Sequence, residues 1–471
     1  MRNFAPESAR YGAAVTLMAM QENLSELECR PVGRLLWHYS LPAVVGMLVM
    51  ALYNVVDRMF IGQGVGPEAI AGLAITFPVM NLTTAVGTLI GVGASAWVSI
   101  LLGRREYERA RRILGNSLVL TLINAALYIV VFAVFLDPIL RVFGASDVTL
   151  PYARGYLQWL LPGLLLTNLT FSLNNIIRAS GYPRVAMGTM LIGAIGNVVL
   201  DPIFIFYFDM GMTGAAIATD IAMVVSAVFV LRHFCRRDVT VGFARGIYKL
   251  RLSIILQIIS IGAAPALVNA CSCLINIFIN NTLLEHGGDT AIGAAGIFVT
   301  FTSMLTMVVL GICQGMQPIV GYNYGAGNLP RLRRAFALAL WVSTAICTAG
   351  CAVGLLLPEW VARVFTADDY LIEVTANCLR HAMLAFAIVG IPIVSTALFQ
   401  SLGKSGKSIF MSLTRQVLFL LPLMWWLVGE MGVDGVWLSF PASDVLATIV
   451  TAVMVWQQMR ALKRESLGAA A

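Results

Sequence analysis

Between Arg112 and Asp137 the chain reads ILGNSLVLTLINAALYIVVFAVFL (residues 113–136), without one charged side chain. A helix needs about 20 apolar residues to cross the roughly 30 Å of hydrocarbon in a bilayer. Runs of this kind recur along the chain, which predicts an all-α integral membrane protein. We expect twelve membrane helices, near residues 36–60, 69–100, 113–136, 154–177, 185–207, 213–234, 255–284, 291–322, 333–357, 376–399, 408–428 and 434–458.

The composition excludes a water-soluble particle. Of 471 residues, 59% are hydrophobic and 12% are charged, whereas soluble chains carry roughly 25% charged residues. Too little polar surface is left to cover a cytosolic enzyme or a nucleic-acid binder. The net charge of +7 therefore reports membrane topology, and no nucleic-acid partner is expected.

The basic residues indicate the orientation. With twelve spans, 26 of the 31 lysines and arginines fall on one side, a count that places Arg178 and Arg415 in loops. Basic loops stay in the cytoplasm. We therefore expect a multi-pass plasma-membrane protein, in the inner membrane of a Gram-negative cell, with both termini cytoplasmic.

An internal repeat divides the chain into two halves. Residues from Ala69 to about Met187 match those from 291 onward at an offset of 222, as in the pairs Gly93/Gly315, Gly103/Gly325 and Gly181/Gly403; near Gly211-x-x-Gly214 the offset becomes 221. Duplicated bundles of six helices are typical of transporters that alternate access between the lobes. We expect a cytoplasmic tail (1–35), a six-helix lobe (36–236), a cytoplasmic linker (237–252), a second six-helix lobe (253–460) and a cytoplasmic tail (461–471).

Charged residues inside the predicted spans are candidate functional groups. A carboxylate at mid-bilayer costs about 2.5–3.5 kcal/mol even on lenient scales. For three of the five such residues, a buried ion pair or a place at the water interface is the plainer interpretation, with a transport role as the alternative. The five are Asp57, Arg58, Asp201, Asp220 and Asp444, and the three are Arg58, Asp220 and Asp444.

Asp201 has the clearest functional setting. Asn197 and Asp201 are four residues apart and share a helix face. Pro202 lacks an N–H for the carbonyl of Val198 and biases Asp201 away from helical geometry. Carboxylate, amide and carbonyl oxygens can hold Na⁺, or the carboxyl can carry a proton. Asp57 adds a second carboxylate, and two acids brought together would share a proton or a cation.

Soft side chains in the spans suit a pocket for varied apolar ligands. Met50 and Met80 are such candidates, although methionines in membrane helices also pack between neighbouring helices. No C-x-x-C pair or metal motif occurs, so we expect no cofactor and no metal beyond a possible Na⁺ at the acids.

The order of five motifs resembles the multidrug and toxic compound extrusion (MATE) transporters, in their DinF-like or MepA-like branch. The likeness covers roughly residues 33–460. The motifs are YNVVDRMFIG (residues 53–62), RASG (178–181), Asp201-Pro202, GMTGAA (211–216) and QGMQPIVGYNYG (314–325).

The resemblance implies a twelve-helix, two-lobed antiporter that expels organic cations in exchange for H⁺ or Na⁺. It places a cation site in the N-terminal lobe, at Asp57, Asn197, Asp201 and Thr219, and a proton-linked hinge at Pro42. The substrate-cavity candidates, beyond the two methionines, are then Asn174, Asn54 and Gln314. The NorM branch uses acids in the seventh and tenth spans, which contain none here, so the resemblance favours the N-terminal site.

Two other classes of protein fit the residues less well. A flippase or exporter of a lipid-linked or other amphipathic metabolite would favour basic residues in the central cavity, and Arg58 is the only clearly intramembrane basic residue expected, against four acids. An intramembrane enzyme would need a nucleophile and base or a metal set. The four histidines are scattered, and H-E-x-x-H and G-x-S-x-G are absent. We expect a monomeric transporter that is not an enzyme.

Overall fold

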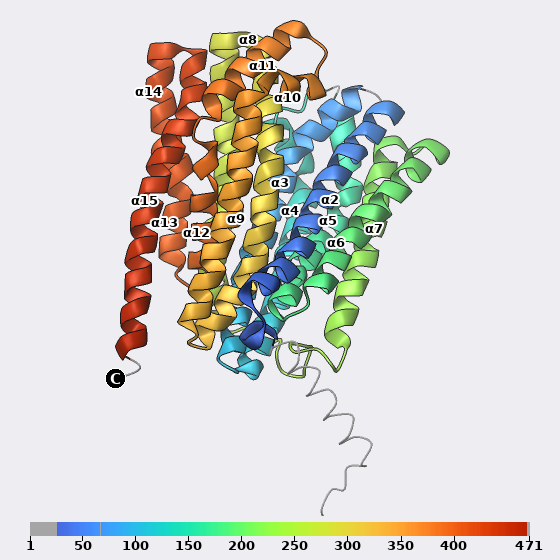
Figure 1. Ribbon diagram of the computed structural model, residues 1–471. Coiled ribbons are helices and arrows are strands. Elements are labelled where there is room, and N and C mark those ends of the chain that lie inside the picture. Colours follow the sequence, from blue (N-terminus) through green and yellow to red (C-terminus); the bar gives the residue numbers. More distant parts are fainter. Residues whose placement is uncertain (1–25, 66, 148, 469–471) are drawn as a thin grey trace, which may run out of the picture.

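The computed structural model describes residues 26–65, 67–147 and 149–468, and every regular element in these ranges is a helix. Two bundles stand side by side (Figure 1), one from the first half of the chain and one from the second. We call them the N lobe and the C lobe. Residues 1–25 of the predicted cytoplasmic tail lie outside the described residues, and the predicted domain boundaries remain predictions.

The N lobe contains six long helices. Each begins a few residues before its predicted span, and all but α6 also end beyond it. They are α2 (Val32–Gly64), α3 (Pro67–Gly103), α4 (Tyr107–Val142), α5 (Leu150–Ala179), α6 (Pro183–Pro202) with a π-helical turn η1 (Ile203–Tyr207), and α7 (Gly211–Cys235).

The C lobe begins with α8 (Leu252–Gly325), which is two successive spans joined at Gly288, where φ is +65°. The shorter elements that follow include a 3₁₀ turn, η2, and a second π-helical turn, η3. They are α9 (Leu329–Leu356), α10 (Pro358–Phe365), α11 (Asp369–Ala382), η2 (Phe386–Ile388), α12 (Gly390–Ser401), α13 (Ser405–Leu413), η3 (Thr414–Leu420), α14 (Leu421–Met431) and α15 (Val433–Gly468).

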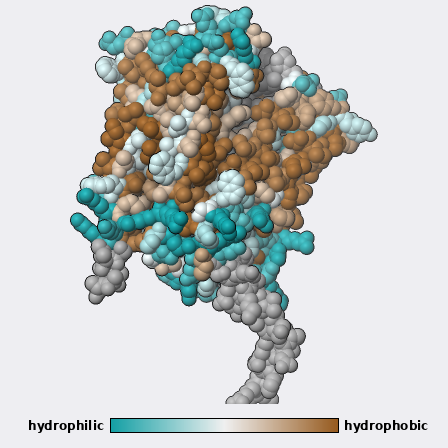
Figure 2. All heavy atoms as spheres, in the orientation of Figure 1, coloured by the Kyte–Doolittle hydropathy of each residue, from teal (hydrophilic) through white to brown (hydrophobic). Residues whose placement is uncertain are grey.

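The predicted membrane fold is confirmed. Within the described ranges, eleven helices are long and apolar enough to cross a bilayer, and α11 with η2–α12, bent by 55°, makes a twelfth candidate. The bend falls at Met383, whose carbonyl accepts a hydrogen bond from the Cys351 thiol at 3.0 Å. On the face seen in Figure 2, a brown apolar belt lies between two hydrophilic rims.

The repeated G-x-x-G motif has the same structural task in both lobes. Gly211 and Gly432 adopt φ of +55° and +58°, which only glycine reaches at little cost. A Cβ on Gly214 would lie 2.7 Å from the carbonyl oxygen of Phe204, and one on Gly435 would lie 2.3 Å from that of Leu427. Each motif therefore turns the chain sharply and lets the last helix of its lobe begin against the preceding one.

The lobes meet most closely on the side where α2 begins and α15 ends, at the bottom of Figure 1, which we call the terminal side. A Cβ on Gly103 would lie 2.0 Å from the carbonyl oxygen of Tyr322, and one on Gly325 would lie 2.1 Å from that of Ile100. These two crossings are related by the repeat offset of 222 residues. The repeated glycines thus form a pseudo-symmetric contact between α3 and α8.

A second pair of glycines brings α3 against the start of α8. A Cβ on Gly93 would lie 1.9 Å from the carbonyl oxygen of Ile258, and one on Gly262 would lie 1.7 Å from that of Leu89. A Cβ on Gly311 would lie 2.7 Å from the Cα of Val44 on α2. These contacts lie in the halves of the helices nearer the terminal side, so the lobes are closed there.

The first described residues also join the lobes on the terminal side. Leu27, which precedes α2, is fully buried. Arg331 of α9 donates hydrogen bonds to the carbonyls of Leu27, at 3.2 Å, and Arg30, at 2.6 Å. The segment before α2 is therefore tied to the C lobe.

We predict that Gly103→Ala destabilises the protein by about 1–3 kcal/mol, because the added methyl has no room beside a backbone carbonyl. The matched control is Gly155→Ala in α5, where a Cβ meets nothing within 4 Å and alanine should stabilise by about 0.4–1 kcal/mol. Thermal unfolding in detergent compares the two. Equal melting temperatures would show that the crossing tolerates a side chain.

Candidate functional site

Two acids from different helices meet inside the N lobe. Asp57 of α2 and Asp201 of α6 are 8% and 0% exposed, and their carboxyl groups are neighbours that interact electrostatically. Because two carboxylates only accept hydrogen bonds and repel each other, a shared proton or a cation would stabilise the pair. The structure thus brings together the two carboxyls that the sequence left in separate spans.

An amide and a hydroxyl extend this pair. Asn197, one turn before Asp201 on α6, is fully buried, and its Nδ2 donates to Thr219 Oγ1 on α7 at 2.7 Å. The Thr219 hydroxyl in turn donates to the carbonyl of Ala215 at 3.0 Å. The four residues predicted as a cation site therefore come from three helices that pack on one another, α2, α6 and α7.

Several oxygens of this group face no donor. Both carboxyl oxygens of Asp201 and the amide oxygen of Asn197 are buried and accept no hydrogen bond from an N–H or O–H of the described residues. A buried acceptor without a donor costs about 1–3 kcal/mol. A bound cation or proton would remove that cost, which makes this group a candidate cation site.

The backbone beside the acids differs from the expected kink. Pro202 has helical φ and ψ of −61° and −31°, and Asp201 stays inside α6. The expectation that Pro202 displaces Asp201 from helical geometry is therefore wrong. The disturbance falls one residue later, in the π-helical turn η1, because the missing N–H of proline is accommodated by a wider turn after it.

Pro42 lies inside α2, which continues without a break from Val32 to Gly64. Its ring is buried, close to the crossing of Val44 with Gly311 of the C lobe. A hinge at Pro42 would therefore bend α2 next to the lobe interface. That role stays a prediction.

The predicted substrate-cavity residues do not form one cluster. Asn54 is exposed on α2 and donates to the carbonyl of Met50 at 2.7 Å. Met80 packs in the core of the N lobe, where its sulfur accepts from Thr76 at 3.8 Å. Asn174 and Gln314 meet at the lobe interface instead, on either side of an arginine.

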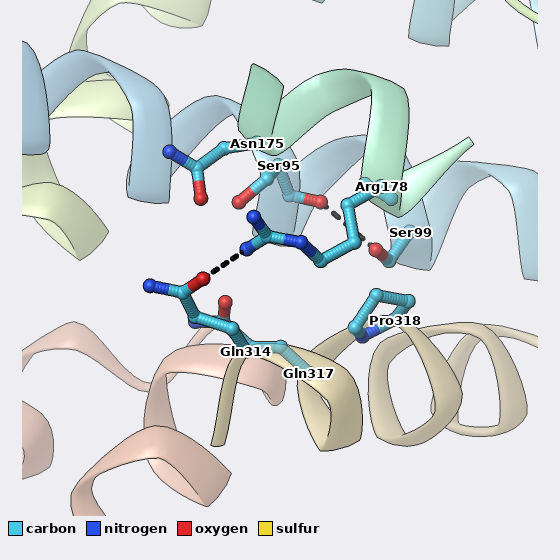
Figure 3. Close-up of a pocket in the computed structure, with 8 residues that line it drawn as sticks. Ser95, Ser99, Asn175, Arg178, Gln314, Gln317 and Pro318 are labelled. Carbon is cyan, nitrogen blue, oxygen red and sulfur yellow. Dashed lines mark hydrogen bonds between the residues drawn. The ribbon is translucent and has the colours of Figure 1, made fainter. Parts of the chain in front are cut away.

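That arginine is Arg178, the residue that sequence reasoning misplaced. The charge pattern predicts a place in a basic loop, but Arg178 is 4% exposed at the end of α5. Its guanidinium donates to Gln314 Oε1 at 2.5 Å and to Asn174 Oδ1 at 2.8 Å. Figure 3 shows it pointing from the N lobe toward α8, in a polar cavity with Ser95, Ser99, Asn175 and Gln317.

The remaining intramembrane charges divide into two cases. Asp444 of α15 is 3% exposed and accepts a hydrogen bond from Arg415 Nε at 2.6 Å, which makes it a structural ion pair. Asp220 of α7 packs against α5, where a Cβ on Gly163 would lie 1.8 Å from its Oδ1. The side chain of Arg58 lies outside the described part of the structure.

The count of one intramembrane basic residue is corrected by this arrangement. Arg415 lies in η3, within the candidate span Ser405–Met431, and Arg178 lies at the end of another. The charge count groups both with the basic loops, although Arg178 directly follows the predicted span 154–177 and Arg415 lies within the predicted span 408–428. Their partners, Asp444 and Gln314, come from distant segments that the local pattern does not reveal.

The architecture by itself defines a class of protein. Two six-helix halves, related by an internal repeat and joined at one side, are typical of secondary transporters. Buried acids in such a bundle mark ion pathways. The comparisons agree with this class.

The MatE family model matches the chain twice, over residues 42–203 and 265–426, once in each lobe. The multidrug export protein MepA of Staphylococcus aureus is 26% identical over 437 residues, 92% of this chain and 96% of MepA. A ligand-bound structure of the MATE multidrug transporter DinF-BH is 37% identical, with a TM-score of 0.85, covering 91% of this chain and 96% of its own. An outward-facing MATE family transporter of the MOP superfamily aligns at 26% identity and a TM-score of 0.88, over 93% and 98%.

The chain therefore belongs to the MatE family of membrane transporters. The resemblance seen in its motifs is confirmed, as is the expectation that it is not an enzyme.

We predict that the ion pair in the C lobe is structural. Asp444→Leu leaves the Arg415 guanidinium without its carboxylate and should cost about 3 kcal/mol, whereas Arg415→Met/Asp444→Leu should recover most of that loss. Thermal unfolding of both variants in detergent measures the difference. A double variant as unstable as the single one would contradict the prediction.

Proposed function

We propose that this transporter exports organic cations and cationic amphipathic compounds from the cytoplasm in exchange for H⁺ or Na⁺. The contact between the buried carboxyls of Asp57 and Asp201 carries the proposal. A pair of acids that needs a proton or a cation is a coupling device, because its charge depends on the ion gradient. The multidrug names of the relatives support the substrate class.

The coupling ion binds among Asp57, Asn197, Asp201 and Thr219. Carboxylate, amide and hydroxyl oxygens suit Na⁺, and a carboxyl pair alone suits a proton. Both ions neutralise the pair, so both fit the same mechanism.

The transport cycle follows from this neutralisation. An ion that enters from the far side neutralises the acid pair, α2 bends near Pro42, and the bound organic cation loses its counter-charge and leaves. A new organic cation from the cytoplasm then displaces the ion. Differential binding to two states is thermodynamically sufficient for such exchange.

The orientation belongs to the same proposal. The basic loops gather on the terminal side, which we assign to the cytoplasm of a plasma membrane or bacterial inner membrane. The conformation described here is then closed to the cytoplasm. Met50, Asn54 and Met80, with Asn174 and Gln314 at the interface, are the proposed cavity residues.

We predict that Asp201→Asn abolishes uptake of a fluorescent organic cation into inverted vesicles under an imposed pH gradient without Na⁺. An amide at this position cannot cycle between charged and neutral forms. The control is Asp137→Asn on α4, whose carboxylate pairs with the half-exposed Arg154 away from the site and whose loss should leave uptake unchanged.

If the unsubstituted protein takes up the organic cation only when a Na⁺ gradient is supplied, the antiport proposal stands and Na⁺ is its coupling ion. Absence of uptake under either gradient, in folded protein and with several cations, would overturn the proposal. Export of a lipid-linked or amphipathic anion would then be tested, because Arg178 and Arg415 place positive charge within candidate spans.

A further inference from the structure

One hydrogen bond crosses between the lobes in the polar cavity of Figure 3. Arg178 Nη1, in the N lobe, donates to Gln314 Oε1 of α8, in the C lobe, at 2.5 Å. The other end of the same amide reaches back, because Gln314 Nε2 donates to the sulfur of Met47 on α2 at 3.6 Å. A single glutamine of the C lobe thus contacts two helices of the N lobe.

The stability of this hydrogen bond depends on whether water can reach the guanidinium. Arg178 is 4% exposed, and none of the ion pairs among the described residues includes it. Its charge is stabilised by two amide oxygens, those of Gln314 and Asn174. Losing one acceptor in a dry interface is costly, whereas water can replace it once the lobes part. The hydrogen bond therefore favours two states, a closed interface without water and an open one in which water binds the guanidinium. A partly open interface, in which Arg178 has lost Gln314 and has not gained water, is disfavoured.

The same arginine is joined to the helix that carries Asn197 and Asp201. Asn174 accepts from Arg178 and donates to the carbonyl of Ala186, at 2.6 Å, and to the hydroxyl of Thr189, both on α6.

The helix that carries Thr219 is held at the same place. Ser226 of α7 donates to the carbonyl of Thr189 at 2.8 Å. A movement of α6 or α7 at the cation site would therefore act on Asn174, and through it on Arg178.

We propose that the bond between Arg178 and Gln314 is a latch that holds the terminal side closed, with Asn174 linking it to the cation-site helices. Arg178 is then a positioning residue for ion coupling. This proposal rests on the proposed function, in which the terminal side must open to take up cargo. Cation release at Asp201 would shift α6, displace Asn174 and free the guanidinium to exchange Gln314 for water.

The test measures access to the cavity from the terminal side. Ser95 lines the cavity beside Arg178 and is 4% exposed, so Ser95→Cys should react slowly with a membrane-impermeant maleimide in inverted vesicles. Labelling is taken as the difference from protein that lacks Ser95→Cys. The exposed Cys29 and Cys235, on the terminal side, report the orientation of the vesicles.

Two substitutions of Gln314 should move the labelling rate in opposite directions. Gln314→Leu removes the acceptor and should speed labelling about tenfold, the size expected for one hydrogen bond to a charged group. Gln314→Glu gives Arg178 a carboxylate and should slow it. Arg178→Lys should also speed labelling, because an ammonium lacks the planar fork that reaches both acceptors.

The matched control is Gln317→Leu. Gln317 lies on the same helix and lines the same cavity, but its Nε2 donates within the C lobe, to Gln400 Oε1 at 3.2 Å. Protein with Ser95→Cys and Gln317→Leu should be labelled at the same rate as protein with Ser95→Cys alone. Equal labelling in Gln314→Leu and Gln314→Glu, or equal acceleration in Gln317→Leu and Gln314→Leu, would overturn the latch.

Labelling needs neither a substrate nor an ion gradient, so the latch and the proposed function fail separately. Opposite shifts in the two Gln314 variants without any cation uptake would support the latch and overturn the organic-cation antiporter. Cation uptake with unchanged labelling in both Gln314 variants would support the organic-cation antiporter and overturn the latch.

Discussion

The close crossing of α3 and α8 on the terminal side is the constraint on which the rest of the structure depends. At Gly103 and Gly325 the backbones of the two lobes touch so closely that a methyl group would overlap a carbonyl oxygen. Close packing of this kind supplies the helix association that the hydrophobic effect does not provide inside a membrane. It also removes water from the interface, and so determines how polar groups there must be satisfied.

Dry surroundings explain the different treatment of charge in the two lobes. In the C lobe, the Asp444 carboxylate is neutralised by the Arg415 guanidinium, which donates a hydrogen bond to it. In the N lobe, Asp201 has another carboxyl as its neighbour, and no described donor points at its oxygens. A duplicated fold has thus become asymmetric in charge. Only the N lobe, among the described residues, contains an acid pair whose energy depends strongly on whether an ion is bound.

Much of this arrangement could be predicted from the residues, and the predictions that are wrong concern residues whose setting depends on the surrounding structure. The spans, the repeat and the proximity of Asn197 to Asp201 follow from local spacing. Arg178 was misplaced because a basic residue at the end of an apolar run looks like a loop residue until its partner is known. Gln314, which accepts its hydrogen bond, is 136 residues away. The effect of Pro202 was misjudged because a π-helical turn can absorb a missing donor as well as a kink can.

The amino-acid sequence by itself determined the membrane class, the succession of spans, the duplication and the side on which the basic loops gather. These depend on hydrophobicity and charge counted along the chain, which each segment carries whatever it packs against. The tertiary structure alone decided that Asp57 meets Asp201, that Arg415 neutralises Asp444 and that Arg178 bridges the lobes. Such contacts join segments far apart in the chain, and their energies depend on burial and on the distance between side chains, which no local pattern contains.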